Sequence, residues 1–295
     1  MNVIETKKLT KFYGKTLGIK DLDLEVTEGE IFGFIGPNGA GKSTTIRLLL
    51  DFIRPTGGSA KIFRKDIHQS SVNIKKDIGY LPGEIFLQEN ISGKACIEYF
   101  QSFKKNIDKK YLKNLISRFE FDTKKKISEY SKGNKQKLAV ILALMHKPKL
   151  LILDEPTSGL DPLNQQEFYD TITETKKWGT TTFFSTHILS EAEKLCDRVG
   201  IIKDGKLLQI EDIDEFKEKN IREIHIETKN NIPLSDLKVE GVEKVEQTNS
   251  GYKLITKGHN GKILRLISKF DIDDIKISEP SLEEIFLHFY EHTNN

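Results

Sequence analysis

Eight consecutive residues and the threonine after them form a candidate phosphate-binding loop. The segment fits the pattern G-x-x-x-x-G-K-[ST] and comprises Gly36, Pro37, Asn38, Gly39, Ala40, Gly41, Lys42, Ser43 and Thr44. In such a loop, glycine allows successive backbone N–H groups to converge on phosphate oxygens. The sequence therefore predicts that this segment binds the phosphates of a nucleotide. Lys42 would contact the β- and γ-phosphates, and the hydroxyl of Ser43 would ligate Mg²⁺.

A second candidate segment is an apolar run, residues 150–153, that ends in two carboxylates, Asp154 and Glu155. A buried strand would deliver both carboxylates to the carboxyl edge of a sheet, where ligands bind in open α/β folds. Asp154 suits coordination of Mg²⁺, and Glu155 is placed to polarise an attacking water. Two solvated acids at a strand end are common by themselves, but together with the phosphate loop they favour a hydrolytic site.

Both segments require a parallel sheet with helices packed on it. A strand-rich segment at 26–35 runs into the phosphate loop, and the apolar positions between residues 46 and 50 suit a helix on that sheet. A strand at 149–153, a helix at 164–177 and a strand at 180–184 form another strand–helix–strand unit. Asp204-Gly205 indicates a hairpin.

Helical patterns occupy the middle of the chain. They predict helices near 92–105 and 108–119, and one from Ser131 that Pro148 stops, because the residue before proline avoids the helical region. The fold class is thus α/β, with a main domain at 1–218 that contains a helical part at about 84–148.

Residues 219–295 predict a small α/β domain of their own. The expected elements are strands at 221–228, 245–247, 252–256 and 275–278, and a helix at 261–269. A capping box, Ser281-x-x-Glu284, opens a final helix.

Composition narrows the functional classes. The chain of 295 residues has 46 Lys and Arg against 44 Asp and Glu, so nothing predicts a nucleic-acid partner. The two cysteines, Cys96 and Cys196, are far apart, which argues against a disulfide scaffold and fits a reducing compartment. The longest apolar run, 138–145, is shorter than the roughly 18–20 residues that a membrane span needs. The first residues lack the apolar core of a secretory signal. We expect a cytoplasmic protein.

The motifs together resemble the nucleotide-binding subunit of ATP-binding cassette (ABC) transporters over at least residues 1–215. Residues 130–134, here called the signature segment, read YSKGN and are similar to the family's LSGGQ, with Ser131 and Gly133 at matching places and Lys132 and Asn134 departing from it. Three further matches occur in the same order along the chain as in the family. Tyr13 matches the aromatic residue that stacks on adenine, Ser158-Gly159-Leu160-Asp161 matches the D-loop, and His187 matches the switch histidine.

Three of these residues also have a purely structural interpretation. Ser131 would cap the helix that follows it, His187 would cap a local turn, and Tyr13 would pack against its own turn.

The resemblance implies an ABC-type P-loop ATPase with an antiparallel β subdomain, a helical subdomain and the C-terminal appendage. It implies ATP and Mg²⁺ as ligands and a head-to-tail dimer in which Ser131 and Gly133 of one protomer close on the γ-phosphate bound by the other. It also implies a separately encoded membrane-spanning permease, which would hold the chain at the inner face of the cell membrane. Export of a drug, an antibiotic or a lipid-like compound is expected.

Two alternatives belong to other classes. A non-transport cassette ATPase, acting in DNA repair or on the ribosome, typically has two cassettes or a long coiled-coil insertion, and neither is present. A nucleotide-binding regulator without turnover is disfavoured by Glu155.

One departure concerns the segment Leu81-Pro82-Gly83-Glu84, where the family usually has a glutamine after the proline. Gly83 cannot supply the side-chain oxygen that this glutamine offers to Mg²⁺. Either Glu84 substitutes as a ligand or the loop acts only on the membrane partner.

Overall fold

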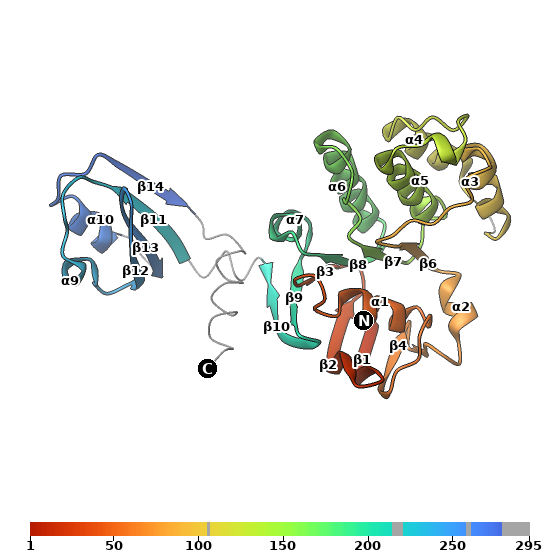
Figure 1. Cartoon of the computed structure of the whole chain (residues 1–295), viewed down its shortest axis with the longest axis horizontal. Helices are drawn as coiled ribbons and strands as arrows, with labels where there is room; N and C mark the ends of the chain where they lie inside the picture. Colours follow the sequence, from red (N-terminus) through yellow and green to blue (C-terminus); the bar gives the residue numbers. More distant parts are fainter. Residues whose placement is uncertain (105–106, 214–220, 258–260, 279–295) are drawn as a thin grey trace. The chain divides into compact units, whose positions relative to one another are not determined.

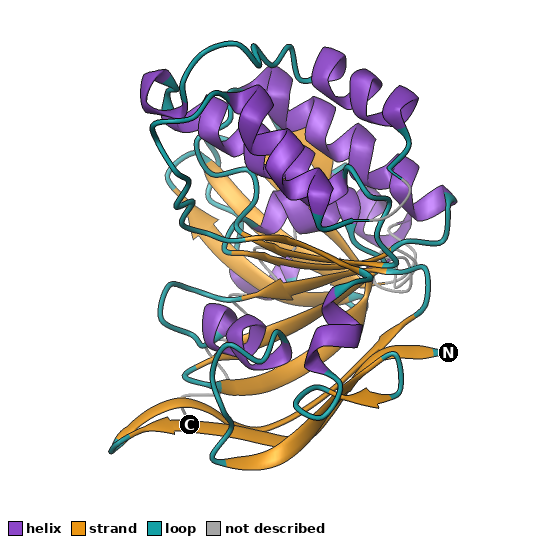
Figure 2. Cartoon of the chain, turned by 90° about the vertical axis from the view of Figure 1, so that its right-hand side faces the viewer, coloured by secondary structure: helices purple, strands orange, loops and turns teal. Residues whose placement is uncertain are grey.

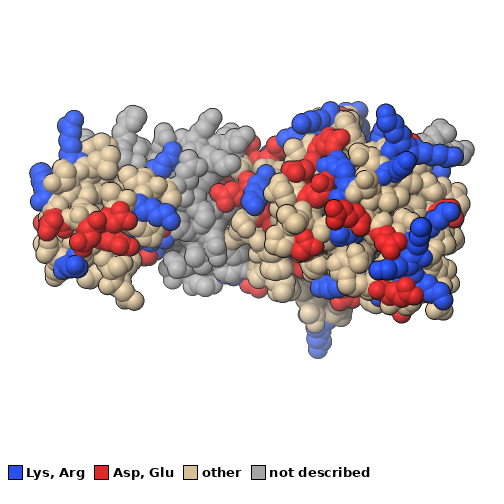
Figure 3. Space-filling view, turned by 90° about the horizontal axis from the view of Figure 1, so that it is seen from above, with Lys and Arg blue, Asp and Glu red and all other residues tan. Residues whose placement is uncertain are grey.

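The computed structural model describes residues 1–104, 107–213, 221–257 and 261–278. The chain divides into two compact units, Met1–Ile210 and Glu211–Asn295. Figure 1 labels their elements in chain order. Basic and acidic side chains are interspersed on the face drawn in Figure 3, in keeping with their nearly equal numbers.

The larger unit begins with a four-stranded antiparallel sheet of order β2-β1-β4-β5. Its strands are β1 (Asn2–Tyr13), β2 (Thr16–Thr27), β4 (Gly57–Ile62) and β5 (Lys65–Asp66). Buried and exposed residues alternate along the second half of β2, where Leu22, Leu24 and Val26 point inward. These side chains join a core that also contains Phe32, Phe34 and the apolar residues of the first helix.

The second sheet has six strands in the order β10-β9-β3-β8-β7-β6. Its strands are β3 (Ile31–Ile35), β6 (Ile78–Leu81), β7 (Leu150–Asp154), β8 (Thr181–Thr186), β9 (Arg198–Lys203) and β10 (Lys206–Asp212). Every residue of β3, β7 and β8 is buried, as expected for parallel strands covered on both faces. The predicted strands at 149–153 and 180–184 are confirmed, each shifted by one or two residues.

Helices cover these sheets (Figure 2). They are α1 (Lys42–Leu49), α2 (Ser71–Lys75), α3 (Gly93–Ser102), α4 (Lys109–Arg118), the 3₁₀ turn η1 (Ile127–Glu129), α5 (Lys132–Leu144), α6 (Pro162–Lys177) and α7 (Leu189–Leu195). Side-chain oxygens cap four of them by accepting a backbone N–H, and these belong to Ser92, Asp108, Ser131 and Asp161.

The predicted helices of the middle segment are confirmed as α3, α4 and α5, and α5 contacts both of the others. α5 ends at Leu144, and Lys147, the residue before Pro148, has a φ of +49°, outside the right-handed helical region. Arg118 links α4 to α6: its Nε lies 2.5 Å from Glu167 and its Nη1 lies 2.5 Å from Glu174.

The smaller unit contains an antiparallel sheet of order β12-β13-β11-β14. Its described elements are β11 (Ile221–Glu227), α9 (Leu234–Leu237), β12 (Val242–Thr248), β13 (Gly251–Lys257), α10 (Gly261–Ile267) and β14 (Asp274–Ser278). The predicted strands and the helix at 261–269 are therefore confirmed as elements. A core of Ile224, Ile226, Leu254 and Ile263 holds them together. The helix predicted from Ser281 lies outside the described residues.

Within the described ranges, no helix is both long enough and apolar enough to cross a membrane.

Candidate nucleotide-binding site

The phosphate loop lies between β3 and α1, where the motif predicted it. Two of its glycines are required by geometry. A Cβ at Gly36 would lie 2.3 Å from the carbonyl oxygen of Ile202, closer than any side chain tolerates. Gly41 has a φ of +112° and sits at the N-cap of α1, a conformation that glycine adopts without strain. The loop thus brings its backbone up to the start of a helix, where N–H groups are free to bind an anion.

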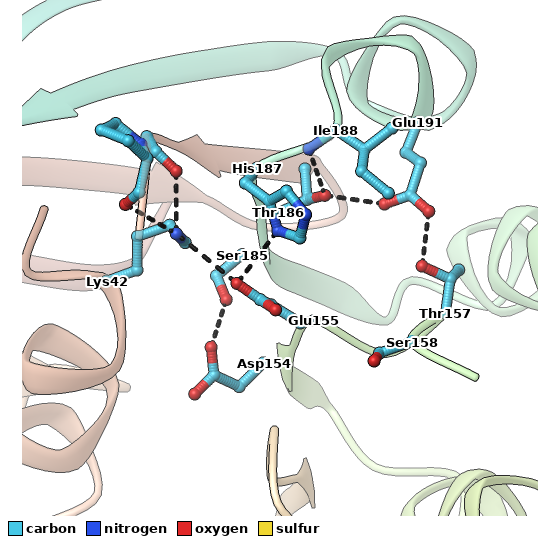
Figure 4. Close-up of polar contacts among 12 residues, drawn as sticks. Lys42, Asp154, Glu155, Thr157, Ser158, Ser185, Thr186, His187, Ile188 and Glu191 are labelled. Carbon is cyan, nitrogen blue, oxygen red and sulfur yellow. Dashed lines mark hydrogen bonds and ion pairs between the residues drawn. The ribbon is translucent and has the colours of Figure 1, made fainter. Parts of the chain in front are cut away.

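Lys42 is turned into this loop and is only 4% exposed. Its Nζ donates to the carbonyl oxygens of Gly36 at 2.8 Å and Pro37 at 3.1 Å (Figure 4). The same Nζ lies 3.6 Å from Oε1 of Glu155. Burial lowers the pKa of Lys42 below its usual value, while the carboxylates of Glu155 and Asp154 act in the opposite direction. Lys42 therefore lies between the carbonyl oxygens of its own loop and the carboxylate of Glu155.

A pocket of about 230 Å³ adjoins the loop. It is lined by Tyr13, Leu17, Gly18, Asn38, Gly39, Gly41, Lys42, Ser43, Thr44 and Glu155. Tyr13 is 45% exposed, and the Nζ of Lys11 lies 5.3 Å from the centre of its ring. The ring of Tyr13 thus belongs to the same pocket as the phosphate loop and offers a face to a flat base.

Asp154 and Glu155 lie at the end of β7 in different environments. Asp154 is buried, and its Oδ1 accepts a hydrogen bond of 2.5 Å from Ser185 on the neighbouring strand. Glu155 has a φ of +46°, which a residue with a side chain seldom adopts. This backbone conformation costs free energy that the surrounding contacts must offset.

His187 follows β8 and faces Glu155. Its Nδ1 lies 3.2 Å from Oε1 of Glu155, the oxygen that also faces Lys42. Figure 4 shows these three side chains converging from β8, β7 and α1. The structure therefore brings together Lys42, Asp154, Glu155 and His187 in one site.

A second pocket, of about 600 Å³, shares Ser43 and Glu155 with the first. Its lining is Ser43, Arg47, Phe52, Tyr80, Pro82, Gly83, Glu84, Phe86, Asp154 and Glu155. A Cβ at Gly83 would lie 3.4 Å from Oδ2 of Asp154, so the position that lacks the usual glutamine is indeed beside this carboxylate. Glu84 lines the pocket but is exposed to solvent.

Ser43 and Asp154 could hold a magnesium ion only together with the phosphates of a bound nucleotide. In the described part of the chain, no group of three or more His, Cys, Asp or Glu side chains could hold a metal by itself. Ser43 and Asp154 offer one hydroxyl and one carboxylate beside the same pocket. Mg²⁺ commonly binds in this way, with phosphate oxygens and water as its remaining ligands.

Ser131 and Gly133 lie at the start of α5 and line neither pocket. Ser131 is exposed, and its Oγ accepts the N–H of Asn134 at 3.3 Å, which confirms the predicted cap. Lys132 donates to Oγ of Ser158 at 3.2 Å. A Cβ at Gly133 would lie 2.8 Å from the carbonyl oxygen of Gly159, so the close approach of these two segments requires glycine there.

Known proteins resemble both units. Residues 19–158 match the family model of ABC transporters, and residues 206–290 match that of the C-terminal domain of DrrA1-3-like ATP-binding proteins. The bacitracin transport ATP-binding protein BcrA of Bacillus licheniformis is 38% identical over 97% of this chain and 96% of its own length. The chain belongs to the ABC transporter ATP-binding family.

Other relatives and solved structures support the same family and fold. The probable multidrug ABC transporter ATP-binding protein YbhF of Escherichia coli is 37% identical over 73% of this chain and 38% of its own length. A solved ATP-binding subunit of an ABC transporter superposes with a TM-score of 0.68 at 28% identity, covering 73% of this chain and 92% of that one. A dimeric cassette solved with ADP and phosphate has a TM-score of 0.65 at 23% identity, over 71% of this chain and 98% of its own, and supports the fold.

The ABC cassette is an ATPase of an export-type transporter, so both non-transport alternatives are set aside. Sequence reasoning missed three residues around its site. Ser185, which bonds Asp154, could have been found, because it is the register partner of Asp154 on the adjacent strand. Arg47 is one helical turn after Ser43 and lines the same pocket. Glu191 on α7 has no local sequence signal.

Replacing Glu84 by alanine separates the two roles that are open for this residue. We expect Glu84→Ala to leave the Mg²⁺ dependence of the isolated ABC cassette within about twofold of the wild type, because Glu84 is exposed. The measurement is ATP turnover during a Mg²⁺ titration, repeated with the membrane partner, whose stimulation should weaken. Asp154→Asn is the positive control and should raise the Mg²⁺ requirement. A several-fold increase with Glu84→Ala, about 1 kcal/mol, would instead make Glu84 a metal ligand.

Proposed function

We propose that this subunit drives export by dimerising head to tail around ATP, with each site built from two protomers. One observation carries the proposal. Ser131 and Gly133 lie at the start of α5, where Ser131 is exposed and Gly133 is half-buried, and neither residue lines either of the two pockets that contain Ser43. The N-terminus of α5 offers backbone N–H groups and the positive end of a helix dipole, which suit a phosphate presented by a second copy.

Within each site, the residues have distinct roles. The loop from Gly36 to Thr44 binds the phosphates, and Tyr13 stacks on the adenine. Ser43 and Asp154 would hold Mg²⁺, which neutralises phosphate charge when bound. Glu155 accepts a hydrogen bond from the attacking water and polarises it. His187 keeps Glu155 oriented toward that water, since its Nδ1 lies 3.2 Å from the carboxylate.

The cargo and the membrane partner follow from the relatives. Two of them are named for transport of bacitracin and of multiple drugs, which supports an amphipathic antibiotic, a drug or a lipid-like compound as cargo. A separate membrane-spanning subunit would bind this cargo and hold the ATPase at the inner face of the membrane. Opening of the dimer after hydrolysis, a two-state change biased by the nucleotide, would then reset that subunit.

Glu155→Gln tests the hydrolytic role. The substitution keeps the shape of the side chain but removes its charge, so we expect turnover at saturating ATP to fall by about 100-fold or more. ATP binding, measured by equilibrium titration, should be retained. Glu98→Gln, which alters an exposed carboxylate on α3, is the matched control. A near-normal rate for Glu155→Gln would contradict the assignment.

Mixing two inactive variants tests whether the site is shared between protomers. Lys42→Ala damages the phosphate loop and Ser131→Arg damages the signature segment, so each variant alone has no intact site. In a mixed dimer one of the two sites receives an undamaged half from each protomer. We therefore expect turnover to return to about a quarter of the wild-type rate in an equal mixture. Continued inactivity at every ratio, with mixed dimers detected, would contradict head-to-tail assembly.

A further inference from the structure

A buried carboxylate outside the predicted motifs connects two loops of the site. Glu191 lies on α7, four residues after His187, and is only 4% exposed. Three hydroxyl groups donate to it. Thr186 Oγ1 lies 2.7 Å from its Oε2, Tyr169 OH lies 3.2 Å from its Oε1, and Thr157 Oγ1 also donates to Oε1. Figure 4 shows the contacts with both threonines.

Thr157 fixes the loop that follows β7. Its carbonyl oxygen accepts the N–H of Leu160 at 3.0 Å, and the N–H of Ser158 is bonded to the carbonyl of Glu155 at 3.2 Å. The loop is therefore a compact turn whose first residue is Glu155. The hydroxyl of Thr157 anchors this turn to Glu191.

Thr186 fixes the turn that carries His187. It is the last residue of β8, and its Oγ1 accepts the N–H of Ile188 at 2.9 Å while donating to Glu191. The backbone on both sides of His187 is thus held through one hydroxyl. Glu191 consequently fastens the Glu155 turn and the His187 turn to a common point.

The three hydroxyl groups of this cluster all act as donors to Glu191. Burial and then the charge of Glu191 raise the pKa of Tyr169, so the phenol stays protonated and remains a donor. Hydrogen bonds to an ionised group are stronger than neutral ones, and loss of the acceptor would leave buried hydroxyls without a partner.

We propose that Glu191 is a positioning residue for hydrolysis. By holding both turns, it sets the 3.2 Å contact between His187 and Glu155 and so the direction in which Glu155 faces the water. The inference rests on the catalytic roles proposed above for Glu155 and His187. It assigns Glu191 no contact with ATP itself.

The test compares the loss of a hydroxyl donor on each of the two turns with the loss of a hydroxyl donor on α6. Thr157→Val and Thr186→Val each remove one hydroxyl at nearly constant shape. Tyr169→Phe is the matched control, because it removes a hydrogen bond from the same carboxylate but lies on α6, outside both turns. We expect the two threonine variants to lower kcat about tenfold with the KM for ATP within about twofold, since only the alignment of the reacting groups changes.

The control variants show the result that is expected if Glu191 serves only to stabilise the fold. Tyr169→Phe should lower the melting temperature but leave kcat within about twofold of the wild type. Thr186→Ser, which restores the hydroxyl, should recover the kcat lost by Thr186→Val. In a Glu191→Leu background, which lacks any acceptor, Thr157→Val should cause little further loss, because the two changes remove one interaction.

Two failures are distinguishable in this experiment. If Thr157→Val and Thr186→Val lower kcat no more than Tyr169→Phe does, Glu191 only stabilises the fold and the inference is wrong. If Glu155→Gln retains turnover in the same assay, the proposed function fails first. The threonine variants decide the question even where Glu191→Leu does not fold.

Discussion

The site depends on the parallel register of three buried strands. Residue pairs at the carboxyl ends of these strands, Ile35 with Thr186 and Asp154 with Ser185, lie side by side across β3, β8 and β7. The segments that leave these ends are the phosphate loop, the Glu155 turn and the His187 turn. Because all residues of the three strands are buried, a slip by one residue would turn each side chain into the opposite packed layer and would also separate these groups.

Within this site, a single carboxylate oxygen lies close to two other polar side chains. Oε1 of Glu155 faces Lys42 on one side and His187 on the other. Its backbone is held at a positive φ, at a cost of about 1–3 kcal/mol, which the contacts around it must offset. A nucleotide phosphate entering beside Lys42 would compete for that lysine and so free Glu155 to face a water. The resting contacts and the proposed reaction therefore involve the same atoms.

Much of this arrangement could be predicted from the sequence, because its signals are local. The phosphate loop is a contiguous motif, and β7 is a short apolar run ending in acids. The contacts of Glu191 could not be predicted, since Thr157 lies 34 residues away and neither residue has a distinctive spacing. The same holds for the bond from Lys132 to Ser158, where the sequence showed only a departure from the family pattern. Such contacts are decided by how α5, α7 and β7 pack.

The central claim is that ATP joins two copies through the signature segment, and the mass of the particle tests it most directly. Light scattering of Glu155→Gln with ATP and Mg²⁺ should give twice the 33.7 kDa of one chain, and a single chain without ATP. Adding Ser131→Arg should abolish the dimer while ATP binding persists. A Glu155→Gln subunit that binds ATP and stays a single chain, or a dimer that forms equally well with Ser131→Arg, would contradict the account.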